Sequence, residues 1–329
     1  MKKSLLLLLL VVHCIKSGYA QEGFSDASLT WKPIASFENK INSTANAGYA
    51  GMYTGISHNV LLMVGGANFP EKAPWMGGKK IYSDKIHYIT LGENDSTIRT
   101  FTPRIPIPMA YGSSISTKDG LIIIGGENNS GPLNKVFYLK LINNKSQILI
   151  ESLPDLPWKI SYTSATYLNN TIYLQGSVGS NQPVFLSLDL SKEKKYWKEL
   201  PPYPRPARTN AGLVVQSAGE SNKIYLLGGR QKQADGVSKV FSDILVFDPK
   251  TEKWEKEGLI TDEIGKEIKR SAHSLLALGS GHILLLGGLG PEPFNTLERL
   301  GIAIQNSEFP EKTRDSLKKE QLKILENHP

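Results

Sequence analysis

The sequence predicts an all-β fold, a β-propeller of six sheets. Of these six, this chain is expected to carry about four complete sheets, parts of two more and a C-terminal helical segment. The main observation is a short apolar strand closed by glycines, which occurs five times in the 329 residues at intervals of 60, 50, 53 and 59. Strand-rich units of about 50 residues are typical of propellers, in which each unit forms one four-stranded sheet. The five segments are residues 61–66, 121–126, 172–176, 224–229 and 283–288, and the third has Gln175 in place of the first glycine.

The strands that complete each unit can also be placed. Trp197 and Trp254 fall in fourth strands, as Trp31 does in an isolated strand pattern, and we expect all three to pack between sheets rather than bind a ligand. The predicted third strands are 85–90, 135–141, 184–190 and 239–248, and the predicted fourth strands are 98–101, 147–151, 196–200 and 253–256.

The N-terminus predicts a secretory signal peptide over residues 1–20. Two lysines precede an apolar run over residues 5–12, and small residues at Gly18 and Ala20 suit cleavage after Ala20. The only cysteine, Cys14, would leave with this peptide, which excludes a disulfide or a cysteine-ligated metal in the mature chain. Cleavage leaves 35 Lys and Arg against 31 Asp and Glu, a net charge of +4. We therefore expect a periplasmic or secreted protein with no membrane association after cleavage and no nucleic-acid partner.

Domain boundaries are expected at residues 21–306 for the propeller and 307–329 for a polar tail. Leu317, Leu322 and Leu325 recur in this tail at helical spacing. Trp31 marks a fourth strand without the three that should precede it, and no strands after residue 306 supply them. We expect the chain to be a truncated propeller that lacks about 60 residues, unless the tail closes the ring in another way.

One face of the propeller should collect the candidate functional residues. Strands alternate in direction, so the loop after each glycine pair and the loop that leads into the next sheet emerge at the same end. Their Arg, Lys and aromatic residues suit an anionic, ring-shaped ligand. The residues collected there are Asn68, Phe69, Trp75, Lys79, Lys80, Tyr82, Tyr111, Glu127, Asn128, Asn129, Arg205, Arg208, Arg230, Arg270 and His273.

Several of these residues also have a structural interpretation. Arg208 and Arg270 could hydrogen-bond the backbone of a neighbouring sheet, and His273 lies in an apolar strand where a buried core histidine is expected. Lys79 and Lys80 could simply be solvent-exposed charges of a long loop, and Glu127 could cap a turn.

The motifs GGANFP, PWMGGKK, MAYGSS, LIIIGGE and GGR, followed by GLGPEPFNTLERLGIAI, resemble the cyclically permuted mutarotase family, the kelch-repeat propellers related to N-acetylneuraminate epimerase. The resemblance implies a six-bladed kelch propeller that interconverts the α and β anomers of sialic acid without a cofactor. The substrate-binding residues that it implies are Asn68, Phe69, Trp75, Lys79, Lys80, Tyr111, Glu127, Arg208 and Arg230.

The same resemblance assigns no catalytic residue to this chain. Mutarotation needs a base for the anomeric hydroxyl, an acid for the ring oxygen and a cation for the carboxylate. The family attributes this work to a Glu and an Arg in the pattern G-E-x-x-x-G-x-R-T. Gly126 and Glu127 begin such a pattern, but Leu133 stands at the arginine position. The family's own copy belongs to a sheet beyond Pro329, so this chain alone is expected to be inactive or unstable.

The sequence also bears on functions other than mutarotation. A non-catalytic carbohydrate-binding or protein-interaction propeller remains the alternative. A copper-radical oxidase needs a cysteine-linked tyrosine, which a mature chain without cysteine excludes. A sialidase needs S-x-D-x-G-x-x-W boxes, and residues 116–120 resemble one only in composition. The sequence assigns no oligomeric state.

Overall fold

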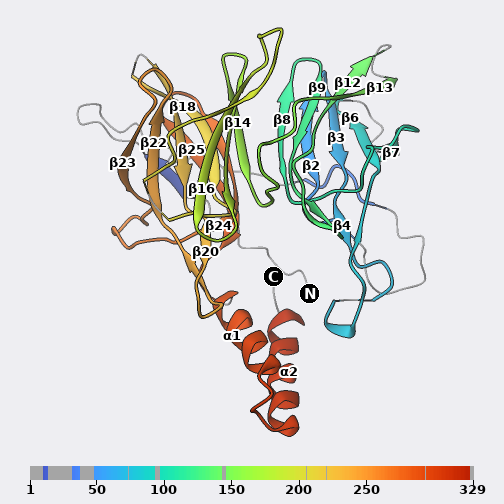
Figure 1. Cartoon of the computed structure of the whole chain (residues 1–329), viewed down its shortest axis with the longest axis vertical. Coiled ribbons are helices and arrows are strands. Elements are labelled where there is room, and N and C mark those ends of the chain that lie inside the picture. Colours follow the sequence, from blue (N-terminus) through green and yellow to red (C-terminus); the bar gives the residue numbers. More distant parts are fainter. Residues whose placement is uncertain are drawn as a thin grey trace.

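The computed structural model describes residues 10–13, 32–37, 48–72, 74–92, 97–142, 146–204, 206–219, 221–292 and 294–326. These residues form four complete four-stranded antiparallel sheets, numbered I to IV in chain order, and a smaller fifth sheet, V (Figure 1). The predicted all-β fold is confirmed, and the third and fourth strands lie within a few residues of their predicted places. Sheet I is β2 (Tyr53–Ser57), β3 (Val60–Val64), β6 (Ile86–Thr90) and β7 (Arg99–Thr100); sheet II is β8 (Ser113–Thr117), β9 (Gly120–Ile124), β12 (Val136–Ile142) and β13 (Gln147–Ser152); sheet III is β14 (Ser164–Leu168), β15 (Thr171–Val178), β16 (Gln182–Asp189) and β17 (Trp197–Glu199); sheet IV is β18 (Gly212–Ala218), β19 (Ser221–Leu227), β22 (Asp243–Asp248) and β23 (Lys253–Leu259).

The first strands of successive sheets are neighbours. Strand β2 lies beside β8, β8 beside β14, β14 beside β18, and β18 beside β24 (Ser271–Leu278) of sheet V. Apolar side chains from adjacent sheets pack between them, for instance in a cluster that joins Leu62 of sheet I to Ile123 of sheet II. Burial of this apolar surface between sheets is the main stabilising contribution to such a fold.

A chain of backbone hydrogen bonds connects the loops that lead into the first strands. Tyr111 donates its N–H to Gly51 O at 2.9 Å, Tyr162 to Tyr111 O at 2.6 Å, Asn210 to Tyr162 O at 2.9 Å, and Ala272 to Asn210 O at 2.8 Å. All five residues have positive φ, between 53° and 65°. Left-handed backbone is unfavourable for non-glycine residues, so the packing around these loops must hold it in place.

The glycine pairs of sheets I, II and IV connect each of these sheets to the next loop. Gly66 donates its N–H to Met109 O at 3.0 Å, Gly126 to Ile160 O at 2.9 Å, and Gly229 to Arg270 O at 2.8 Å. Each acceptor lies two residues before a left-handed loop residue. A Cβ on Gly126 would come within 2.0 Å of the Tyr53 hydroxyl and 2.4 Å of a backbone oxygen, so this turn requires glycine.

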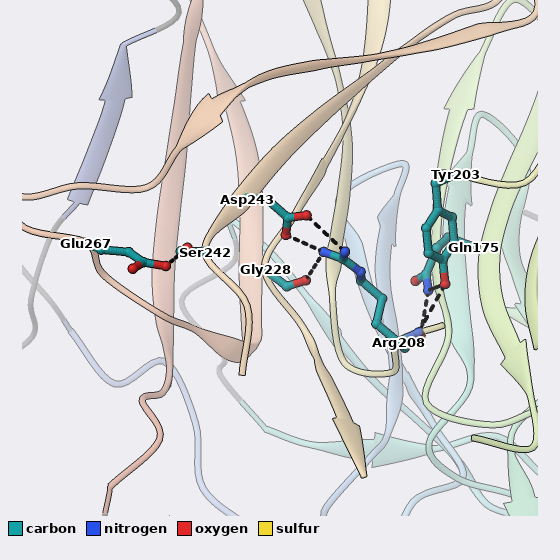
Figure 2. A network of polar contacts seen from close by, with 7 residues as sticks. All are labelled: Gln175, Tyr203, Arg208, Gly228, Ser242, Asp243 and Glu267. Atoms are coloured by element: carbon teal, nitrogen blue, oxygen red, sulfur yellow. Dashed lines mark hydrogen bonds and ion pairs between the residues drawn. The ribbon is translucent and has the colours of Figure 1, made fainter. Parts of the chain in front are cut away.

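Gln175 explains why the third unit lacks a glycine pair. Its side-chain Nε2 donates to Arg208 O at 2.7 Å (Figure 2). Arg208 is two residues before Asn210, so this side chain makes the contact that a glycine N–H makes in the other sheets. Ser164 Oγ donates to Gln175 Oε1 at 3.0 Å. Without the glycine turn, β15 and β16 pair continuously from Thr171 to Val178.

Arg208 is a structural residue of sheet IV. Its side chain is fully buried, and its guanidinium donates to Asp243 Oδ1 at 2.6 Å, to Asp243 Oδ2 at 3.0 Å and to Gly228 O at 2.9 Å (Figure 2). This two-point pairing satisfies a charge that would otherwise be very unfavourable in the core. It differs from the expectation that Arg208 binds substrate, because the guanidinium has no surface left for a ligand.

Two helices follow sheet V, α1 (Phe294–Gln305) and α2 (Glu311–Glu326). They project from the end of the sheets where β20 (Arg230–Lys232) and β4 (Ala67–Asn68) lie (Figure 1). The helical region therefore begins earlier than the expected residue 307. Apolar residues at Phe294, Leu297 and Leu300 have helical spacing, and Thr296 donates its N–H to Glu292 Oε2 at 3.2 Å near the start of α1. None of the described helices is long and apolar enough to cross a membrane.

The predicted signal peptide stays a prediction. Of residues 1–20 the structure describes only β1 (Leu10–His13), which pairs with a strand of sheet V. Trp31 also lies outside the described residues. The other two tryptophans contact a preceding linker as expected for packing between sheets: Trp197 Nε1 donates to Pro154 O, and Trp254 Nε1 donates to Pro201 O, both at 2.9 Å.

Replacing Arg208 tests its structural role. Arg208→Met should lower the free energy of unfolding by about 3–5 kcal/mol, because it removes the guanidinium that balances the charge of the buried Asp243 carboxylate. Urea denaturation measures the change. Arg104→Met is the matched control: its exposed pair with Asp84, at 2.8 Å, should contribute less than about 1 kcal/mol. Equal effects of the two substitutions would contradict the structural assignment.

Candidate functional site

Three short hairpins extend beyond the glycine pairs and carry the candidate site. In sheet I, β4 (Ala67–Asn68) pairs with β5 (Ile81–Tyr82); in sheet II, β10 (Glu127–Asn128) pairs with β11 (Gly131–Pro132); in sheet IV, β20 (Arg230–Lys232) pairs with β21 (Ser238–Val240). Because each starts from an equivalent turn, the hairpins emerge at the same end of the sheets as the left-handed loops.

Glu127 is the centre of a polar cluster that draws on three sheets. Its Oε1 accepts hydrogen bonds from the Tyr82 hydroxyl at 2.8 Å and the Tyr162 hydroxyl at 3.1 Å. The Lys80 ammonium lies 3.5 Å from the same oxygen. Tyr82 and Lys80 come from sheet I, Glu127 from sheet II, and Tyr162 from the loop before sheet III. We call these four residues, together with Tyr111, the Glu127 cluster.

Aromatic rings surround the cation of the Glu127 cluster. Lys80 Nζ lies 5.1 Å from the ring centroid of Tyr82 and 5.0 Å from that of Tyr111, and it donates to the Tyr82 hydroxyl at 3.1 Å. The Tyr111 and Tyr162 rings lie 5.2 Å apart. An ammonium between two ring faces gains cation–π attraction, and Lys80 is half-buried as a result.

The phenols of the cluster are held in their protonated form. Burial raises the pKa of Tyr82, and the hydrogen bond to Glu127 and the charge of Glu127 raise it further. Burial and the same carboxylate also raise the pKa of Tyr162. For Tyr111, burial raises the pKa while the charge of Lys80 acts in the opposite direction. At neutral pH these phenols are therefore hydrogen-bond donors to a carboxylate or a sugar oxygen.

Arg230 continues the site towards the helices. Its guanidinium lies 4.2 Å from the ring centroid of Phe294 at the start of α1. Burial lowers the pKa of Arg230, while the charge of Glu298 and the neighbouring Tyr162 act in the opposite direction. Glu298 itself fixes α1 on the hairpin, because it accepts hydrogen bonds from Ser238 N at 2.6 Å and Ser238 Oγ at 3.0 Å. Arg230 remains a cation. It is near Tyr162 and therefore borders the Glu127 cluster.

The structure brings three of the sequence-predicted binding residues into direct contact. Lys80, Tyr111 and Glu127 belong to one cluster, and Arg230 is near it. Tyr162 was missed, although it occupies the same left-handed position as Tyr111. Aligning the five loops would have found it. The remaining candidates lie on the sheet I hairpin or its loop: Asn68 in β4, Phe69 directly after it, Trp75 in the 3-10 turn Pro74–Met76, and Lys79 exposed beside Lys80.

Other candidates do not reach the Glu127 cluster. Arg208 is buried with Asp243, as described above. His273 is buried on β24, in agreement with the interpretation as a core histidine. Arg205 lies outside the described residues. Among the described residues no group of three or more His, Cys, Asp and Glu side chains is arranged to hold a metal ion.

Two hollows lie at the other end of the strands, away from the three hairpins. One, of about 300 Å³, is lined by residues of sheet IV that include Lys223 and Asp248. The other, of about 310 Å³, includes Lys192 and Lys194 near sheet III. Neither contains a residue of the Glu127 cluster. We place the candidate site at the cluster because polar and aromatic side chains from separate sheets converge there.

Comparisons with known proteins agree with this architecture. The family model for the KLHDC2/KLHL20/DRC7 Kelch-repeats domain matches residues 52–288. The N-acetylneuraminate epimerase of Yersinia pestis (strain Pestoides F) is 32% identical over 108 residues, which are 31% of this chain and 27% of that protein. The N-acetylneuraminate epimerase of Salmonella enteritidis PT4 (strain P125109) is 32% identical over 118 residues, 33% of this chain and 29% of that protein. The match thus spans less than a third of these relatives.

The solved structure of YjhT has a similar fold. It aligns with a TM-score of 0.59 and 12% sequence identity over 75% of this chain and 79% of that one. At this identity the similarity concerns the fold alone.

His273 gives a pH dependence that can be measured. Burial lowers its pKa to about 4, and the charge of Arg270 acts in the same direction. An unfolded chain binds this proton near pH 6.5, so the unfolded state holds more protons between pH 6.5 and 4. The stability that neutral His273 provides is full above pH 6.5 and falls by up to about 3 kcal/mol as the pH drops to 4.

The variant His273→Gln removes this titration. Urea unfolding at several pH values should show a shallower loss of stability between pH 6.5 and 4 than in the wild type. His58→Asn, at an exposed turn position, is the control and should keep the wild-type slope. An unchanged slope in His273→Gln would show that another group carries the pH dependence.

Proposed function

Because this chain belongs to the kelch-repeat family, and its sequence is related to the N-acetylneuraminate epimerases, we propose that it binds an acidic sugar of the N-acetylneuraminate type at the Glu127 cluster and interconverts its anomers. The identity to these epimerases covers only part of their length. The proposal therefore depends on the chemistry of the site.

The observation that carries the proposal is the pairing of Glu127 with a cation and two phenols on one exposed end of the sheets. A sugar acid presents a carboxylate, several hydroxyls and an apolar ring face. Arg230 supplies a cation for the carboxylate, the phenols supply donors for hydroxyls, and the rings of Tyr111 and Tyr162 supply faces for the sugar ring.

The same groups provide the proton transfers of mutarotation. Glu127 takes the proton of the anomeric hydroxyl while the Lys80 ammonium protonates the ring oxygen, and the ring carbon–oxygen bond breaks to give the open carbonyl form. Reclosure on the other carbonyl face returns both protons and gives the other anomer. Glu127 Oε1 and Lys80 Nζ lie 3.5 Å apart. Because reclosure returns both protons, the protonation of this pair is restored after each catalytic cycle.

Binding without turnover is the second candidate function. Leu133, at the arginine position of the family pattern, packs against the core cluster of sheets I and II. It supplies no cation there. In addition, Tyr82, Tyr162 and Lys80 already occupy Oε1 of Glu127 in this structure, so a base acting through that oxygen would first have to lose these contacts.

Proton exchange spectroscopy on N-acetylneuraminate at equilibrium measures the rate of anomer exchange. Wild-type protein should increase this rate above buffer, and Glu127→Gln should reduce the increase by about 10²–10⁴-fold. The matched control is Glu151→Gln. Glu151 pairs with Lys140 at 2.6 Å, and Lys140 also lies over a tyrosine ring, but this pair is on β12 and β13, away from the Glu127 cluster.

The outcomes separate the two functions. Saturable binding of N-acetylneuraminate without faster exchange would favour the binding module and reject turnover. Absence of both would reject the site. Equal loss in Glu151→Gln and Glu127→Gln would mean that the effect is not specific to the cluster.

A further inference from the structure

Sheet V differs from the other sheets at its third-strand position. In sheets I to IV, the place beside the second strand is taken by the next long strand of the same unit: β6, β12, β16 or β22. In sheet V the second strand is β25 (His282–Leu289), and the chain passes from it into α1. The edge of β25 is therefore not paired by the residues that follow it in the described chain.

The N-terminal strand β1 occupies this edge. It pairs antiparallel with β25, so that the sheet has the order β1, β25, β24 (Figure 1). The register places Leu10 opposite Leu285 and Val12 opposite Ile283. Direction and position are those of a third strand, although β1 comes from the opposite end of the sequence.

The edge that β1 covers belongs to a well-packed strand. Ile283 and Leu285 are buried in the cluster that joins sheet V to sheet IV, and Leu284 between them is also buried. On the neighbouring β24, Leu276 remains 53% exposed. An apolar strand with unpaired backbone N–H and C=O groups at its edge favours the addition of another strand.

We propose that the edge of β25 is a strand-docking surface, and that its occupant in the uncleaved chain is the segment Leu10–His13. This segment lies within residues 1–20, which the sequence assigns to a signal peptide. It therefore completes sheet V as long as it is attached, and cleavage after Ala20 uncovers an edge that accepts an extended apolar strand. The proposal stands independently of the sugar-binding site.

Disulfide trapping in the full-length chain tests the register. In a Cys14→Ser background, the pair His13→Cys and His282→Cys faces across the two strands. Mild oxidation should form an intramolecular disulfide, detected by mass spectrometry after proteolysis. The matched control combines His13→Cys with Leu284→Cys, which is displaced by two residues along β25 and should cross-link at least about tenfold more slowly.

Hydrogen exchange provides a second measurement that does not depend on new cysteines. In the full-length chain, Val11→Pro should speed exchange of amides in β25 by about tenfold, because proline interrupts the pairing of β1. Amides of β9 in sheet II should exchange at the wild-type rate.

Trapping in the aligned pair, together with faster exchange in Val11→Pro, supports the docking surface. Equal trapping in the aligned and displaced pairs would overturn it, as would unchanged exchange in β25. Disulfides between two chains would identify a second copy as the occupant and would also overturn the assignment to Leu10–His13.

Discussion

The arrangement of the sheets depends on the series of backbone hydrogen bonds that connects the left-handed loop residues. Gly51 accepts the first of these bonds, and Tyr111, Tyr162, Asn210 and Ala272 each donate to the carbonyl of the previous loop residue, which fixes the spacing of neighbouring sheets. Four of these five residues are not glycine, so each contributes unfavourable backbone energy of about 1–2 kcal/mol. The glycine turns and Gln175 offset this cost, because they bond to the same loops two residues earlier.

The candidate site is a consequence of this arrangement. Tyr111 and Tyr162 are consecutive members of the hydrogen-bonded chain, so their rings are carried on backbone that both neighbouring sheets hold. Glu127 follows the glycine turn that bonds to the loop before Tyr162. The Tyr162 hydroxyl thus reaches the carboxylate from backbone that the neighbouring loops hold, and the Tyr111 ring packs beside it. The site is preorganised by the contacts that hold the sheets together.

Much of the fold could be predicted from sequence because it depends on local patterns, whereas the roles of single residues depended on distant partners. The apolar runs and glycines specify the strands, but the partner of Arg208 is Asp243, 35 residues away, and no local pattern indicates that pair. Tyr162 was missed because the third unit lacks the glycine pair that marks the others. The start of α1 was misplaced because its apolar spacing is short and follows directly on a strand.

The location of a bound sugar tests the account most directly. A crystal structure of the chain soaked with N-acetylneuraminate should place the sugar within hydrogen-bond distance of Glu127 and the Lys80 ammonium, with its ring against Tyr111 or Tyr162. A sugar bound instead in the hollow near Lys192, with the Glu127 cluster unaltered, would contradict the assignment of the site.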